Sequence, residues 1–155
     1  MVSILEQPVK AILGYNARMG SIIIYTDGGS RGNPGPSGAG AVIYNGKKKI
    51  GDVSEYLGHR TNNWAEYEAL ILALTLARDE LGKVVKSVEV RMDSELIVKQ
   101  MKGEYRVKNP DMKEKHMRVK ELIAESFPGI TFTHVRREKN KEADKNANDA
   151  MDRGT

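Results

Sequence analysis

The segment that decides the fold is residues 22–35, IIIYTDGGSRGNPG. Isoleucine and tyrosine favour the enclosed environment of a central strand, and the apolar run that begins at Ile22 ends on a carboxylate, Asp27. A glycine-rich stretch follows, and glycine permits backbone turns that a side chain would obstruct. The segment therefore predicts a buried strand that carries Asp27 at its carboxyl end, directly before a turn.

Apolar patterning after this segment predicts one α/β domain. Asn45-Gly46 is typical of a two-residue hairpin, and the polar residues 61–63 precede a helix that is apolar around most of its surface, as in helices buried against a sheet. The expected strands are residues 22–27, 38–44, 48–57, 87–92 and 130–135, and the expected helices are residues 64–81, 95–101, 111–126 and 142–151. This order predicts a five-stranded mixed sheet, three strands antiparallel and then parallel, with helices on both faces.

Composition sets limits on the class of protein. The chain has 155 residues, 39% of them hydrophobic and 30% charged, which suits one domain with a core. Its formal charge of +4 permits a polyanionic partner without demonstrating one, and the absence of cysteine suits a reducing cytoplasm. Residues 1–20 contain no run long enough for a membrane span or an export signal. We therefore expect a cytoplasmic monomer with an N-terminal arm at residues 1–20 and a folded domain at residues 21–152.

Four acidic residues occupy positions from which their side chains can come together. Asp27 and Asp93 each follow an expected strand, Glu66 lies one turn inside the long helix, and Asp144 lies in the first turn of the last helix. If the first, fourth and fifth strands are neighbours, these side chains converge at one end of the sheet. Burying like charges together is unfavourable unless a cation offsets their repulsion, so the group suits a metal site.

The ligand chemistry favours Mg²⁺ or Mn²⁺. Carboxylates without cysteine or suitably spaced histidine suit hard divalent cations better than Zn²⁺. Two such ions about 3.5–4 Å apart can activate a water and stabilise the leaving oxygen of a phosphodiester. We therefore expect two ions and the hydrolysis of a phosphodiester.

The segments that carry the acids resemble the type 1 ribonuclease H family. The similar segments are residues 25–36 (YTDGGSRGNPGP), 61–66 (TNNWAE), 92–94 (MDS) and 140–144 (NKEAD). The resemblance covers residues 22 to about 151, which would make residues 21–152 a ribonuclease H catalytic domain. It implies endonucleolytic cleavage of the RNA strand of an RNA/DNA hybrid, with the four acids as catalytic residues and metal ligands.

The resemblance also implies contacts to the substrate. Asn33, Asn62 and Asn63 would touch the minor groove of the hybrid, and Thr61 would help to hold a phosphate of the DNA strand. Amides can exchange hydrogen bonds with 2′-hydroxyls and base edges, and the 2′-hydroxyl distinguishes RNA from DNA. Taken singly, Asn33 suits a turn, and Asn62 or Asn63 suits a helix cap. We expect binding from all three asparagines, with Asn62 or Asn63 also capping the helix.

Two departures from the family pattern concern basic residues and histidine. Residues 99–118 are compact where many bacterial members insert a basic handle, and their basic side chains suit either a solvated face or weak phosphate contact. The loop before the last acid carries Arg136 and Arg137 where well-studied members carry a histidine, and we expect these arginines to contact substrate phosphate. His134 is typical of a strand residue with a partly packed imidazole rather than of a catalytic group.

Two alternatives remain open. A nuclease or transposase-like core acting on DNA strands would share the acids, but it would lack the asparagine-rich motifs. A catalytically weak module that binds hybrid or duplex RNA would share the fold, although the presence of all four acids argues against it. Duplex RNA therefore stays open as a second partner beside the RNA/DNA hybrid, and no membrane partner is expected.

Overall fold

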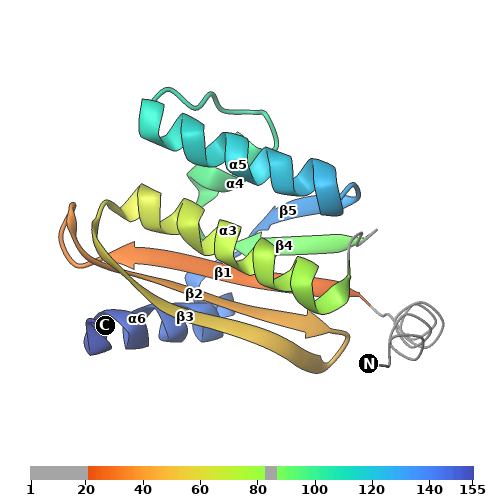
Figure 1. The fold of residues 1–155 in the computed structure, drawn as a ribbon, viewed down its shortest axis with the longest axis horizontal. Coiled ribbons are helices and arrows are strands. Elements are labelled where there is room, and N and C mark those ends of the chain that lie inside the picture. The colour runs from red at the N-terminus through yellow and green to blue at the C-terminus, as the bar shows by residue number, and fades with distance from the viewer. Residues whose placement is uncertain (1–20, 83–86) are drawn as a thin grey trace, which may run out of the picture.

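The computed structural model describes residues 21–82 and 87–155, so the expected arm at residues 1–20 lies outside the described residues. Its centre is a five-stranded sheet (Figure 1). The strands are β1 Ile22–Ser30, β2 Gly35–Asn45, β3 Lys48–Arg60, β4 Val88–Met92 and β5 Ile130–His134. They lie in the order β3-β2-β1-β4-β5, with β1, β2 and β3 antiparallel and β1, β4 and β5 parallel. The predicted mixed sheet and the predicted neighbourhood of the first, fourth and fifth strands are confirmed.

Helices cover both faces of the sheet, as predicted. They are α3 Asn62–Leu81, α4 Glu95–Met101, α5 Pro110–Ser126 and α6 Lys141–Arg153, and a short 3₁₀ helix, η2, spans Arg137–Lys139. Figure 1 shows α6 on the side of the sheet away from α3 and α5. Within the described residues, no helix combines the length and the apolar character that a membrane crossing requires.

The main core lies between the sheet and α3. Ile24 of β1 and Val90 of β4 are fully buried, and they belong to one cluster with Leu70 and Leu74 of α3. On its other side α3 packs against α5. The helix is thus enclosed between the sheet and α5, which explains why its sequence is apolar around so much of its surface.

The first strand differs from the sequence prediction. We expected a turn directly after Asp27, but β1 continues through the glycine-rich stretch to Ser30, which pairs with Ser37 of β2. The parallel pairing of β1 with β4 ends earlier, at Thr26 and Met92. The prediction was wrong because these glycines serve close packing within a strand as well as turns. Since Asp27 and Asp93 each follow the last parallel pair, their side chains leave the sheet side by side.

The last helix packs unusually close to β2. A side chain on Gly40 would place its Cβ 2.0 Å from the carbonyl oxygen of Ala143, which is far inside van der Waals contact. The buried face of α6 consists of small residues, Ala143, Ala147 and Ala150. This combination of glycine on the strand and alanine on the helix lets α6 reach the sheet, and with it Asp144.

We expect Gly40→Ala to destabilise the protein by about 3 kcal/mol, because the added methyl group must displace the backbone of α6. Gly29→Ala is the matched control, since its Cβ would meet the side chain of Met151 at an ordinary 3.5 Å. Urea unfolding of both variants measures the difference. Equal stability of the two variants would show that the helix does not depend on this close approach.

Candidate metal centre

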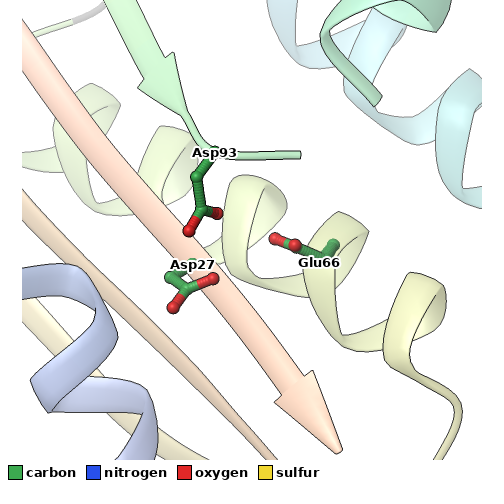
Figure 2. A group of neighbouring side chains, drawn as sticks. All are labelled: Asp27, Glu66 and Asp93. Atoms are coloured by element: carbon green, nitrogen blue, oxygen red, sulfur yellow. The ribbon is translucent and has the colours of Figure 1, made fainter. Parts of the chain in front are cut away.

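Three carboxylates form the centre of the candidate site. Asp27, Glu66 and Asp93 each offer an oxygen atom, and these atoms lie within 4.8 Å of one another. Asp27 and Glu66 are buried, with 8% and 6% of their surface exposed. Figure 2 shows the three side chains pointing toward one another from β1, from α3 and from the end of β4. Buried oxygen ligands gathered in this way are the donor set that Mg²⁺ and Mn²⁺ prefer, so the residues present fit a divalent cation.

The position of Glu66 depends on Gly28. The amide N–H of Gly28 donates a hydrogen bond of 3.1 Å to Oε1 of Glu66. A Cβ on Gly28 would lie 2.3 Å from the carbonyl carbon of Ala65, so only glycine permits α3 to approach β1 here. The glycine that follows Asp27 in the sequence therefore brings the second acid to the first.

Asp144 lies beside this trio without being part of it. It is half-buried in the first turn of α6, and its side chain is hydrogen-bonded with that of Asp27. All four predicted acids line one cavity of about 530 Å³. The structure thus brings the four acids together at one end of the sheet, as the spacing predicted, and it separates them into three close carboxylates and one neighbour.

The carboxylates of the site resist ionisation in the absence of a cation. Burial raises the pKa of Asp27 from 3.8 to about 9, and the charges of Glu66 and Asp93 add to this effect. Burial likewise raises the pKa of Glu66 from 4.5 to about 8, assisted by Asp93 and opposed by the N–H of Gly28 and the guanidinium of Arg137. A divalent cation would reverse both shifts, because it stabilises the charged form of each carboxylate.

Basic side chains stand at the edge of the cavity. Arg136 and Arg137 follow β5 and line the cavity, and Nε of Arg137 lies 4.0 Å from Oδ2 of Asp93. The side chain of Arg137 is 86% exposed, so it is available to a ligand. His134 is a strand residue, as predicted, and it ends β5 one residue before the expected end, but the expected packing of its imidazole was wrong. The residue is exposed and lines the cavity at the point where β5 ends.

The asparagine motif gathers around the start of α3, with a different cap from the one expected. Thr61 is the N-cap, and its Oγ1 accepts a hydrogen bond of 3.3 Å from the N–H of Trp64. The N–H of Asn62 donates to Oδ1 of Asn33 at 3.0 Å, so Asn33 joins the β1–β2 turn to the helix. The prediction that Asn62 or Asn63 caps the helix was wrong, because α3 already begins at Asn62, so both asparagines lie inside its first turn.

These four polar residues do not share one cavity. Asn62 lines the cavity of the acids, whereas Thr61 lines a neighbouring cavity of about 350 Å³ together with Asn109. Asn33 and Asn63 are exposed and line neither of these two cavities.

Sequence reasoning missed two asparagines that support the site. Asn140 is buried, and its Nδ2 donates 2.9 Å to the carbonyl oxygen of Thr26, which ties the start of α6 to β1. Asn148 lines the cavity and contacts Asp144. The available signal for Asn148 was its spacing, because residues four apart on a helix lie on the same face.

Comparison with known proteins identifies relatives of the whole described domain. A family model described as reverse transcriptase-like matches residues 25–150. Ribonuclease HI of Halobacterium salinarum is 42% identical over 136 residues, which are 87% of this chain and 66% of that protein. A bifunctional protein of Mycobacterium tuberculosis is 41% identical over 133 residues, 84% of this chain and 35% of that protein. The chain therefore spans less than two thirds of the length of these relatives.

Solved structures agree with these relatives. LC11-RNase H1, solved in complex with an RNA/DNA hybrid, is 50% identical with a TM-score of 0.81, covering 86% of this chain and 98% of that one. RNase H1 of Halobacterium salinarum is 41% identical with a TM-score of 0.80, covering 86% and 99%. With a family model matched over residues 25–150 and relatives of this identity, the chain belongs to the type 1 ribonuclease H family.

Proposed function

We propose that this chain is a metal-dependent endonuclease that hydrolyses the RNA strand of RNA/DNA hybrids. The observation that carries the proposal is the cluster of buried Asp27 and Glu66 with partly buried Asp93, whose oxygens lie within 4.8 Å of one another. A cluster of like charges destabilises a fold unless it serves a cation, so its presence favours catalysis over a purely structural role. The hybrid-bound relative, 50% identical over 86% of this chain, supports the choice of substrate.

The proposed cofactor is Mg²⁺ or Mn²⁺, with two ions held by the trio and by Asp144. When bound, such ions supply activation of the attacking water and charge stabilisation of the leaving oxygen. The protein contributes the positions of the ligands. β1 and β4 present Asp27 and Asp93 side by side, and α3 is held against β1 at Gly28, so that Glu66 faces both.

Different residues around the acids are proposed to recognise the sugar of the nucleic acid and to bind its phosphate backbone. Asn62 lines the acid cavity, and its backbone N–H donates to Oδ1 of Asn33, so the two neutral amide side chains lie close to each other at the start of α3. Such amides can read a 2′-hydroxyl in the minor groove. Arg136 and Arg137, which follow β5 and line the acid cavity, would contact phosphate. Asn63 and Thr61 are proposed to extend these contacts along the two strands.

A catalytically weak module that binds hybrid or duplex RNA is the alternative. The buried trio argues against it, because a module that only binds nucleic acid has no need of three repelling acids. Incubation with end-labelled hybrid, duplex RNA and duplex DNA in Mg²⁺, Mn²⁺ or chelator separates the two functions. Cleavage of hybrid alone supports the proposal, and binding without cleavage supports the alternative. The monomeric state and the cytoplasmic location stay predictions.

We expect Asp27→Asn and Asp93→Asn each to abolish hybrid cleavage while the fold is retained. Each change removes a metal-binding charge but keeps the size of the side chain. Asp149→Asn is the matched control, because Asp149 lies on α6 and pairs with Lys145 at 2.7 Å outside the cavity. Cleavage rates measure activity, and circular dichroism checks the fold. Metal-dependent cleavage by both site variants would exclude these residues as ligands.

We expect the stability of the metal-free protein to fall as the pH rises from about 4 to about 9. The pKa values of Asp27 and Glu66 are higher in the folded state, about 9 and about 8, than their ordinary values of 3.8 and 4.5. Between these limits the folded state holds more protons than the unfolded state, so each unit of pH lowers stability. The contribution is fully present below the ordinary values and is lost above about pH 9.

The Asp27→Asn variant tests whether the pH dependence of stability comes from the carboxylate of Asp27. In chelator, the free energy of unfolding of this variant should equal that of the parent protein near pH 4. At pH 8 it should exceed the parent value by more than about 1.4 kcal/mol, the equivalent of one pKa unit. Urea unfolding at several pH values measures the difference, and added Mg²⁺ should reduce it at pH 8. If the difference in unfolding free energy did not change with pH, its cause would be packing rather than charge.

We expect Arg136→Ala with Arg137→Ala to weaken binding of hybrid, duplex RNA and duplex DNA alike. Loss of two phosphate contacts should flatten the slope of log Kd against log salt by about 1 to 2. Asn62→Ala should instead weaken hybrid binding alone by about fivefold at every salt concentration, because a neutral hydrogen bond is worth about 1 kcal/mol and releases no counterions.

The control for this comparison is Lys47→Ala with Lys48→Ala, which removes two exposed charges at the β2–β3 hairpin, at the end of the sheet away from the acids. Binding is measured with Ca²⁺ in place of Mg²⁺ to prevent cleavage. If Asn62→Ala changed the salt slope, or if the hairpin control flattened the slope as much as the arginine variant, the assigned roles would be wrong.

A further inference from the structure

Asp144 receives a hydrogen bond from a neighbouring amide. Nδ2 of Asn148 donates to Oδ1 of Asp144 at 3.2 Å and to the carbonyl oxygen of Asp144 at 2.9 Å. Asn148 lies one turn further along α6 and lines the same cavity as the four acids. Its side chain thus holds one carboxylate oxygen of Asp144 and leaves the second oxygen free of this contact.

The chemistry of the partners fixes which way the Asn148 amide faces. On its other side, Oδ1 of Asn148 accepts a hydrogen bond of 3.2 Å from NH2 of Arg31. A guanidinium can only donate and an ionised carboxylate can only accept, so a reversed amide would lose both bonds. Arg31 is itself held by an ion pair of 2.6 Å with Asp152. The amide therefore lies between a guanidinium donor and the acid.

Asp144 has a particular need for such a partner. It lies outside the close trio, on a helix that packs against the other face of the sheet, and its neighbour Asp27 is an acid. When both acids are ionised they repel each other, so an Asp144 side chain without a partner would then turn out of the cavity toward solvent. The amide donor of Asn148 offsets this repulsion and restricts the rotamer of the acid.

We propose that Asn148 is a positioning residue that holds Asp144 in the orientation needed for metal binding, and that Arg31 holds Asn148 in turn. The proposal rests on the proposed function of the four acids. It also links the β1–β2 turn, which carries Arg31, to the acid on α6. Partners of metal ligands in this position commonly affect metal affinity or activity by about 10- to 100-fold.

The test compares Asn148→Ala and Asn148→Leu with Asn146→Ala. Leucine preserves the volume of asparagine but has no amide. Asn146 is the matched control, because its Nδ2 donates 3.2 Å to the carbonyl oxygen of Ala41 and so binds the same helix to the sheet away from the acids. Three quantities are measured for each variant: kcat and KM on hybrid, the Mg²⁺ concentration that gives half of the metal-dependent rise in unfolding temperature, and the unfolding temperature in chelator.

We expect both Asn148 variants to lower kcat by about 10-fold, leave KM within about twofold, and raise the half-saturating Mg²⁺ concentration by about 10-fold. Asn146→Ala should lower the unfolding temperature in chelator while its kcat and metal dependence stay those of the parent. If leucine restored parental kcat and metal affinity, the role of Asn148 would be packing, and the proposal would be wrong. It would be equally wrong if both Asn148 variants behaved like Asn146→Ala.

A double substitution tests whether Asn148 acts through Asp144. In an Asp144→Asn background, Asn148→Ala should change the half-saturating Mg²⁺ concentration by less than about twofold, because the residue through which it acts has lost its charge. A full effect in that background would overturn the proposal. The metal-dependent unfolding temperature reads this outcome without any cleavage, so a parent protein that failed to cleave hybrid would reject the proposed function and leave the Asn148 result intact.

Discussion

Repulsion between buried carboxylates is the constraint on which this structure depends. Asp27 and Glu66 are almost fully enclosed, and Asp93 lies within 4.8 Å of both through its nearest oxygen. Side chains on flexible loops would separate to relieve such repulsion. Here each acid is attached to an element that the core holds in place, because the strands and α3 share one buried cluster. The stability of the core therefore maintains an arrangement that is locally unfavourable until a cation binds.

Two glycines, which have no side chain, are as important to this arrangement as the acids. Gly28 lets α3 approach one side of the sheet, and Gly40 lets α6 approach the other. At both positions a Cβ would meet the backbone of the facing helix, at 2.3 Å or less. The two helices carry Glu66 and Asp144, so the distance from each helix to the sheet sets the distance of its acid from Asp27. Packing on both faces of one sheet thus determines the geometry of the candidate metal centre.

The sequence was sufficient for the topology and for the prediction that the four acids lie near one another, because both depend on local patterns. Apolar runs ending at Asp27 and Asp93 located two adjacent strands, and a helix apolar on most sides had to be enclosed. The sequence was insufficient where the outcome depended on contacts between distant segments. The extension of β1 to Ser30 depends on pairing with β2, and the roles of Asn140 and Asn148 depend on how α6 lies against β1. Such contacts leave no periodic signal within a single segment.

The charge distribution links the metal to the proposed substrate. The four acids repel an approaching polyanion when they are ionised, and the formal charge of +4 over the whole chain does not cancel this local field. Arg136 and Arg137 at the cavity edge reduce the field only in part, since Arg137 is exposed and stands 4.0 Å from Asp93. A bound divalent cation would remove the remaining repulsion and so favour the approach of phosphate. Because coupling between two binding sites is reciprocal, a bound hybrid must then strengthen metal binding by the same factor. The acids that repel the proposed substrate when ionised are therefore the groups that make metal and substrate bind cooperatively.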